Sequence, residues 1–446
     1  MPFSPTTPAP CQWFSYLAAL LDVRSASRLL RLFLGAVLAV GRRTVTSWLR
    51  AAGVTHDYRP AYTTVAAAGK RTDLLAARLA YAALRPMLAG AERLTFGIDD
   101  TPTQRYGPEV EGAGVHHNPT PGPAAARFVY GHVWGTLAWL ARHPAWGAIA
   151  LPLLARLYVR RKDLPRVPPD HRPAFRTKPE LAVGLVRWAV TGPGFLGKAP
   201  WVVADGAYAQ AAFLRPVRAL GVTVVSRLRR DAALRCVPAP RRPGRRGRPR
   251  TDGERRIDPA KRAGQARGWR VGAFDLYGKR AAKAYKTFLA TWRPAGGLVR
   301  VVLVREPRGW RAFFCTDPAA AVADVLGGVA DRFGLETAFR DAKEVAGAGR
   351  RQVRFLWADV GAFHLCLWTY TLTEAWAWGR SADGLVDRSA SPWDDPSRRP
   401  SHADKRRAWR RELMGPDIRA ALRTATTDAE IEAAAERLLQ WAAELQ

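Results

Sequence analysis

The spacing of apolar and polar positions divides the chain into a helical front part and a longer part that mixes strands and helices. Residues 1 to about 88 are predicted to be helical, because apolar residues recur every three or four positions in RSASRLLRLFLGAVLAVGRRTVTSWLRAAG (24–53). Thr44 or Thr46 can cap a second helix there, and Gly53 can end it. This pattern fits a DNA-binding helix-turn-helix and a simple helical hairpin about equally well.

From residue 92 the apolar positions follow the pattern of strands. ERLTFGID (92–99) predicts a strand that ends at Asp99 and Asp100, and APWVVADGAYA (199–209) predicts a buried strand that ends at Asp205. The order of three strands, a helix, a strand, a helix and a strand favours a mixed sheet flanked by helices. The remaining elements of this series are predicted as strands at 128–141, 146–159 and 222–228, the first two forming a hairpin, and as helices at 178–190 and 210–220.

A strand-rich stretch then interrupts the series before the last helices. A Pro/Gly/Arg-rich loop (236–262) precedes four strand-like runs, at 268–278, 285–292, 298–306 and 310–317. The apolar run at 361–378 contains His364 and Glu374, so we predict a buried helix there and not a membrane span. After Trp378 the chain becomes polar, and a last amphipathic helix is predicted at 427–445.

Charge changes this picture, because the 446 residues include 70 Lys and Arg against 38 Asp and Glu, a net charge of +32. Such an excess favours a polyanionic partner, either nucleic acid or an acidic membrane surface. A membrane surface is the weaker interpretation, since the basic stretch at 404–413 is short. The scattered cysteines fit neither a zinc site nor a disulfide framework, and they indicate a reduced, cytoplasmic protein. They are Cys11, Cys236, Cys315 and Cys366.

Three carboxylates are the candidates for catalysis. Asp99 and Asp205 follow the carboxyl ends of predicted strands, where ligands bind in open α/β sheets. If the two strands are neighbours, these carboxylates converge, and Glu336 can join them from a helix. Three oxygen ligands suit Mg²⁺ or Mn²⁺, and a pair of such ions can cleave a phosphodiester. Taken singly, each aspartate fits a turn or cap, and Glu336 fits an ordinary charged helix surface.

The order of Asp, then Asp in an "ADGAY" turn, then Glu in a helix resembles the DDE transposases of bacterial insertion sequences. Arg332-x3-Glu336-x6-Lys343 is similar to the Tyr-x2-Arg-x3-Glu-x6-Lys signature of one branch, with Val329 at the Tyr position. The resemblance covers roughly residues 90 to 378.

It implies a ribonuclease H-like catalytic domain with a strand-rich insertion. It also implies two Mg²⁺ (or Mn²⁺) ions on Asp99, Asp205 and Glu336, and DNA phosphates on Arg332 and Lys343. "GIDDT" in similar sequences favours Asp99, with Asp100 as the alternative.

We therefore predict an α/β protein with four parts. These are a helical DNA-binding region (1–88), a ribonuclease H-like catalytic domain (89–228 plus 318–378), a β-rich insertion with a basic loop (229–317), and a polar, helical tail (379–446). Further DNA contacts are predicted from Arg340 and from the loop residues Arg245, Arg246, Arg248 and Arg250, whose Arg-Gly-Arg-Pro core resembles an AT-hook. An aromatic residue of the insertion (Trp269, Tyr277 or Trp292) can stack a flipped base, although core packing is favoured for each.

The predicted activity is that of a bacterial transposase, which cuts transposon ends and joins them to target DNA. It would act as a homodimer in a synaptic complex, in the cytoplasm at the nucleoid. Two alternatives stay open. One is another ribonuclease H-like nuclease, such as a resolvase, and the other is a non-catalytic DNA-binding protein derived from a transposase.

Overall fold

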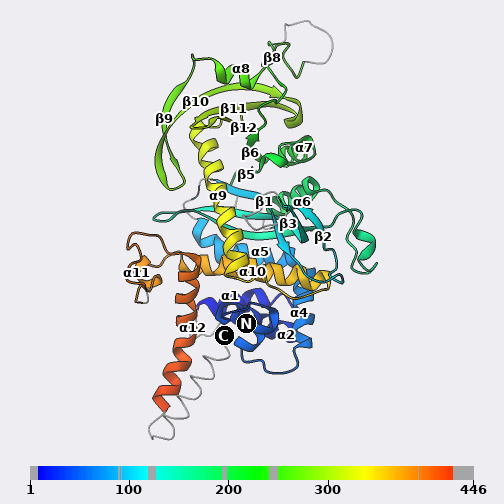
Figure 1. Ribbon diagram of the computed structural model, residues 1–446, viewed down its shortest axis with the longest axis vertical. Helices are drawn as coiled ribbons and strands as arrows, with labels where there is room; N and C mark the ends of the chain where they lie inside the picture. The colour runs from blue at the N-terminus through cyan, green and yellow to red at the C-terminus, as the bar shows by residue number, and fades with distance from the viewer. Residues whose placement is uncertain are drawn as a thin grey trace.

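A mixed sheet of twelve strands runs through the molecule in a computed structural model (Figure 1). The structure describes residues 9–88, 91, 93–118, 127–192, 198–240, 250–389 and 391–424. At the centre of the sheet, β1 (Leu94–Gln104) pairs antiparallel with β3 (Phe128–His143) and parallel with β5 (Pro200–Ala204). The next strands outward are β4 (Gly147–Tyr158) on β3 and β6 (Thr223–Leu228) on β5. The predicted mixed sheet and the hairpin within it are confirmed.

The strand-rich stretch extends this same sheet. Strand β12 (Gly309–Cys315) pairs antiparallel with β6, and β11 (Gly297–Glu306) and β10 (Lys279–Trp292) follow. Strand β9 (Arg270–Leu276) forms a hairpin with β10, so all four predicted runs are strands. The smaller elements here and at the opposite edge are β2 (Gly114–His117), β7 (Leu234–Arg235), β8 (Arg256–Ile257) and α8 (Pro259–Gly264).

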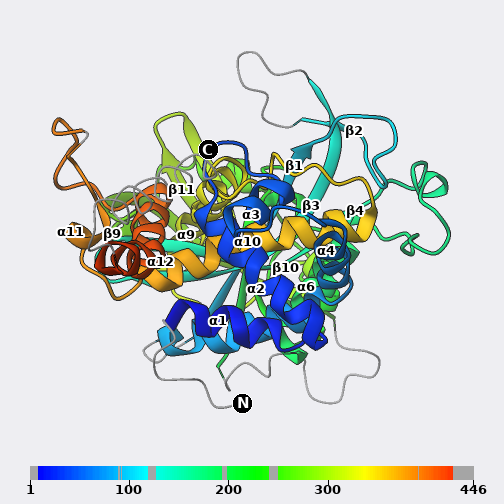
Figure 2. The same cartoon turned by 90° about the horizontal axis from the view of Figure 1, so that it is seen from below.

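Helices cover the sheet and form the lower end of the molecule (Figure 1). The long α9 (Val322–Glu344) reaches from the strand-rich end down to α10 (Leu356–Ala377). Helix α10 is buried along almost its whole length, as predicted, and the N-terminal helices lie beneath it (Figure 2). None of the described helices is long and apolar enough to cross a membrane. The other long helices are α1 (Ala9–Ala18), α2 (Val23–Leu38), α3 (Val45–Ala51), α4 (Arg59–Lys70), α5 (Thr72–Leu79), α6 (Lys178–Thr191) and α7 (Ala211–Ala219).

The N-terminal helices begin and end where the sequence indicates. The Thr44 side chain accepts a hydrogen bond from the backbone N–H of Ser47 and caps α3. Gly53 follows α3 with φ +75°, a conformation that glycine adopts without strain. Short helical turns complete the described chain at Ala80–Leu84, Arg85–Leu88, Leu164–Arg166, Gly206–Tyr208, Arg293–Ala295 and Ala382–Leu385 (α11).

A pair of glycines lets α4 and α10 cross in direct backbone contact. A Cβ atom added to Gly361 would lie 1.9 Å from the carbonyl oxygen of Val65, and one on Gly69 would lie 1.9 Å from that of Trp357. Both distances are far below any van der Waals contact, so each position excludes a side chain. This crossing fixes the N-terminal helices to the buried helix that supports the sheet.

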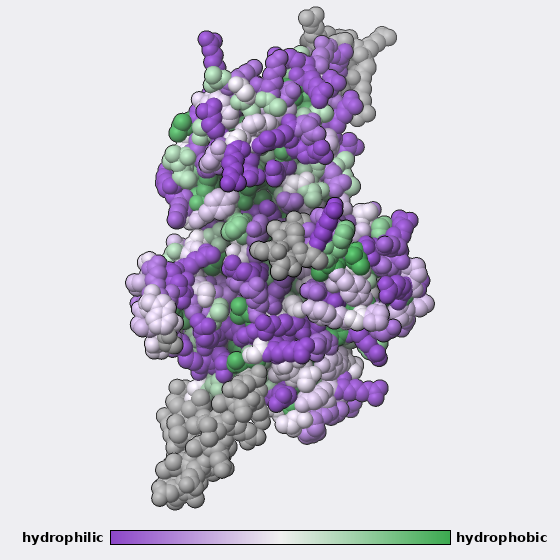
Figure 3. Space-filling model, viewed as in Figure 1, coloured by the Kyte–Doolittle hydropathy of each residue, from purple (hydrophilic) through white to green (hydrophobic). Residues whose placement is uncertain are grey.

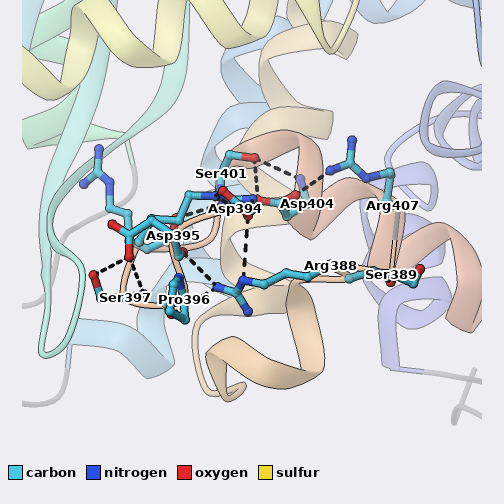
Figure 4. Close-up of polar contacts among 12 residues, drawn as sticks. Arg388, Ser389, Asp394, Asp395, Pro396, Ser397, Ser401, Asp404 and Arg407 are labelled. Atoms are coloured by element: carbon cyan, nitrogen blue, oxygen red, sulfur yellow. Dashed lines mark hydrogen bonds and ion pairs between the residues drawn. The ribbon is translucent and has the colours of Figure 1, made fainter. Parts of the chain in front are cut away.

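Between α10 and α12 (His402–Thr424) the chain passes the turn between β3 and β4, where Arg399 donates a hydrogen bond to the carbonyl oxygen of Trp146 at 2.9 Å. Asp404, which is 1% exposed, accepts hydrogen bonds from Ser401 and forms an ion pair with Arg398. Figure 4 shows Ser401 and Arg407 both directed at Asp404. Deeper inside, Glu374 of α10 accepts hydrogen bonds from His402 (2.8 Å) and Lys405 (2.5 Å). The predicted helix at 427–445 lies outside the described residues.

The glycine crossing can be tested by Gly361→Ala. We expect the free energy of unfolding to fall by about 1–3 kcal/mol or more, because the added methyl group must push the two helices apart. That cost exceeds the roughly 1 kcal/mol by which alanine favours a helix over glycine. Urea denaturation measures the change, and Gly379→Ala, in open space just after α10, is the matched control. Equal stability of both variants would show that the crossing is not tight.

Glu374 should make stability depend on acid. Burial alone would raise its pKa, but Lys405 and His402 outweigh burial and lower the pKa to about 2 from an ordinary 4.5. The ionised carboxylate therefore stabilises the fold above pH 4.5, and this contribution is lost as the pH falls from 4.5 through about 2. The difference in unfolding free energy between wild type and Glu374→Gln should narrow over that range. Glu344→Gln, at an exposed site, should leave a constant difference, and a constant difference for Glu374→Gln would refute the expectation.

Candidate active site

Asp99 and Asp205 lie at matching positions on two neighbouring parallel strands. The pairing of β1 with β5 runs from Leu94 opposite Pro200 to Ile98 opposite Ala204, and the two aspartates are the next residues on each strand. Strand β5 ends before Asp205, whereas β1 continues through Asp99 to Gln104, so β1 is longer than the sequence predicted. The two aspartates are neighbours at the point where the parallel pairing stops. This juxtaposition requires only that the two predicted strands pair directly, as they do.

One arginine of α9 contacts both carboxylates. Nη1 of Arg332 lies 2.5 Å from Oδ2 of Asp99, and Nη2 lies 3.9 Å from Oδ1 of Asp205. Arg332 and Asp99 are about one-fifth exposed, and Asp205 is 46% exposed. The two acids thus share a single cation, which holds α9 against this edge of the sheet.

The side chain of Asp100 takes the opposite direction, as alternation along a strand requires. It accepts a hydrogen bond from the hydroxyl of Tyr208 and lies 2.8 Å from Nζ of Lys178, at the start of α6. Burial and the charge of Asp100 raise the pKa of the Tyr208 hydroxyl well above its ordinary value, so it stays protonated and donates. Asp100 is therefore engaged with α6 and the turn after β5, whereas Asp99 faces Arg332.

Burial raises the pKa of Asp99 to about 6, which Arg332 and the N–H of Asp100 only partly offset. The charges of Asp205 and Asp100 add to the increase. A carboxylate that is hard to ionise beside a second carboxylate marks a place where additional positive charge is favourable.

Glu336 lies one turn after Arg332, and both residues line a cavity of about 420 Å³. The cavity lies between α9, the ends of β5 and β6, and the strand-rich extension. Its charged lining residues are Asp205, Arg227, Lys283, Glu306, Arg311, Arg332 and Glu336. Figure 3 shows a largely hydrophilic face, with hydrophobic residues in the hollow near the upper end of α9. The strand-rich extension thus forms one wall of the candidate site.

The other predicted DNA-contacting residues are dispersed. Arg340 is exposed, lies 3.4 Å from Asp341, and lines a different cavity. Lys343 lies half-buried near the end of α9, where burial lowers its pKa. Arg250 pairs with Glu254, while Arg245, Arg246 and Arg248 lie outside the described residues. The apolar residues of α9 are buried, namely Leu335, Ala338, Phe339 and Ala342.

Aromatic side chains line the upper wall of the cavity. Tyr277, in the turn between β9 and β10, is 65% exposed, and its ring lies edge-on to Phe333 at 5.9 Å. Its φ of 55° shows that the turn holds it in an unusual conformation. Of the other insertion aromatics, Trp292 is buried, whereas Trp269 lies beside Lys286 and Arg305. Val329 also lines the cavity, so the expected Tyr position faces the site.

The chemistry of the donors fits a divalent cation in part. Asp99 and Asp205 offer neighbouring carboxylate oxygens, the ligands that Mg²⁺ and Mn²⁺ prefer, and burial together with the charge of Asp205 raises the pKa of Asp99. Within the described ranges, however, no three acidic, histidine or cysteine residues are close enough to hold a metal ion together. Glu336 lies one helical turn beyond Arg332, and it is Arg332 that contacts Asp99 and Asp205.

The mixed sheet carries two aspartates side by side, and a neighbouring helix carries a glutamate. This arrangement defines a nuclease-like architecture. A model of the family described as DDE superfamily endonuclease matches residues 17–293, more than half of the chain. The chain therefore belongs to the DDE endonuclease superfamily, and its sheet is ribonuclease H-like. The match includes Asp99 and Asp205 and stops before α9, so Glu336 is supported by its position alone. The search of curated proteins found no match to this chain.

Sequence reasoning missed the Tyr208–Asp100–Lys178 contact. Tyr208 stands three residues after Asp205 in "ADGAY", so its position was a usable signal, whereas Lys178 gave none.

We expect Tyr208→Phe to lower the free energy of unfolding by about 1–3 kcal/mol, because a partly buried carboxylate loses a donor. Urea denaturation measures this loss. Tyr130→Phe, whose hydroxyl donates to an exposed carbonyl of Gly107 at 3.2 Å, is the control and should change little. Equal effects would mean that Asp100 does not need Tyr208.

Proposed function

We propose that this DDE endonuclease is a transposase, which cuts the ends of a DNA element and joins them to a target. The observation that carries the proposal is the placement of Asp99 and Asp205 on adjacent parallel strands, joined by Arg332, with Asp205 and Glu336 lining one cavity. The order of these acids and the strand-rich extension before α9 match the resemblance seen in the sequence. In this proposal Asp99, and not Asp100, is the first ligand, because Asp100 is engaged on the opposite side of the strand.

Each residue then has a distinct role. Asp99, Asp205 and Glu336 would hold two Mg²⁺ or Mn²⁺ ions, which supply an activated water and stabilise the leaving oxygen during phosphodiester cleavage. Without ions, Arg332 relieves the repulsion between the two aspartates. Its guanidinium has further N–H groups for a phosphate oxygen.

Other basic residues on the cavity wall would hold the DNA backbone near the acids. Arg227 and Arg311 line the cavity from the sheet, as does Lys283, which lies 2.9 Å from Glu306 on the neighbouring strand β11. Their charges favour a polyanion without reading its sequence. The helical N-terminal region and the basic loop at 241–250 would add contacts to the element's ends. Joining two ends in one complex would require a homodimer.

A plain nuclease or resolvase is the second candidate, and the two activities differ in the step after the cut. A transposase transfers the freed 3′-hydroxyl to a second duplex, whereas a nuclease releases it. A non-catalytic descendant is disfavoured, since all three acids are present and two of them converge.

The test is cleavage and strand transfer on duplexes that carry the DNA flanking the coding sequence, with Mg²⁺ or Mn²⁺. We expect Asp99→Asn, Asp205→Asn and Glu336→Gln each to lower the cleavage rate by more than about 100-fold, as loss of a metal ligand does. Chelation with EDTA should abolish cleavage by the wild type.

Asp100→Asn is the matched control, one residue away on the other face of β1, and it should retain far more activity than Asp99→Asn. Circular dichroism verifies that each variant is folded. Full activity of a folded Asp205→Asn or Glu336→Gln would refute the site. Cleavage without any strand transfer would favour the nuclease.

A further inference from the structure

A second cavity, of about 430 Å³, lies away from the acids between α7 and the turn that joins β10 to β11. It shares no lining residue with the catalytic cavity. Three arginines dominate it, with Asp252 as the acidic member, and the lining residues are Arg215, Arg218, Thr251, Asp252, Arg293, Ala295, Gly296 and Gly297.

Two of these arginines are held in place by backbone carbonyls. Arg215 of α7 donates to the carbonyl oxygen of Arg293 at 2.9 Å, and Arg218 donates to that of Ala295. Neither has a carboxylate partner within the part of the chain that the structure describes. Each guanidinium has five N–H donors, so most of them stay free after one such bond.

Two glycines form the turn beside these arginines. Gly296 has φ +73° and stands beside the stem of Arg215, and Gly297 has φ +154° and stands 3.6 Å from Nη1 of Arg218, measured from an added Cβ. Asp252 lies 3.3 Å from Nε of Arg293 and offsets one charge. Two positive charges are therefore left over in a concave site with fixed donors, which is the chemistry that recognises a phosphate.

The two cavities lie on opposite faces of the sheet. The buried residues of α7 share a core with Val202 and Val224, whereas those of α9 around the catalytic cavity share one with Val203 and Val225. The second cavity is therefore a site of its own and not an extension of the catalytic one.

We infer that the cavity of Arg215 and Arg218 binds a backbone phosphate of DNA, at a place separate from the catalytic cavity. This inference rests on the proposed function for the identity of the anion. The contact would add affinity without sequence preference, since it meets the DNA backbone alone.

The experiment measures binding of a duplex of about 30 base pairs and arbitrary sequence. Fluorescence anisotropy gives the affinity across a series of salt concentrations. For Arg215→Gln/Arg218→Gln we expect the slope of log affinity against log salt to become shallower by about one, because one phosphate contact is lost.

The matched control is Arg380→Gln/Arg411→Gln, which removes the same charge from two arginines already paired with Glu412 and Asp387. It should keep the wild-type slope. Thermal denaturation shows that all variants are folded.

An unchanged slope in Arg215→Gln/Arg218→Gln, or an equal change in the control, would overturn the inference. So would inorganic phosphate, added at constant ionic strength, that removes the difference between wild type and variant, since the cavity would then be a site for a small free anion. None of these results bears on cleavage, so the proposed function is tested separately.

Discussion

Two like charges on neighbouring parallel strands repel one another, and the architecture around the candidate site depends on how that repulsion is offset. The pairing of β1 with β5 places Asp99 and Asp205 side by side, and Arg332 supplies the one cation that contacts both among the described residues. Because Arg332 belongs to α9, the same contact fixes the helix that carries Glu336. Burial, more than the remaining repulsion, raises the pKa of Asp99.

A second group of charges holds the outer end of the same strand. Asp359 of α10 is fully buried and contacts Arg105, just after β1, as well as Arg351 and His132. Burial of such a group is tolerated only when each charge is paired, so the contact ties β1 and β3 firmly to α10. Strand β1 is thus held by ion pairs at two points, to α9 at Asp99 in its middle and to α10 just beyond its end at Gln104. The glycine crossing with α4 then connects this core to the N-terminal helices.

Much of this arrangement is predictable from the residues. Strand periodicity identified β1, β3, β4, β5 and β6, and the positions of Asp99 and Asp205 after apolar runs identified the paired acids. Side-chain direction was harder: only the observed partners Tyr208 and Lys178 show that Asp100 faces away. The charged candidate residues of α9 were all predicted to act on DNA at one site. The packing of the helix, however, separates Arg332 and Glu336 from Arg340 and Lys343. Local spacing cannot reveal which turn of a helix meets the sheet.

The pairing of β6 with β12 makes the strand-rich segment part of the sheet and not an appendage. Without residues 229–317, β6 would become a bare edge strand, with unpaired backbone groups and the apolar pattern of an interior strand. An edge of that kind recruits strands from other chains. The insertion therefore covers β6 and prevents the sheet from pairing with other chains. A shortened relative of this chain would need another way to cover β6.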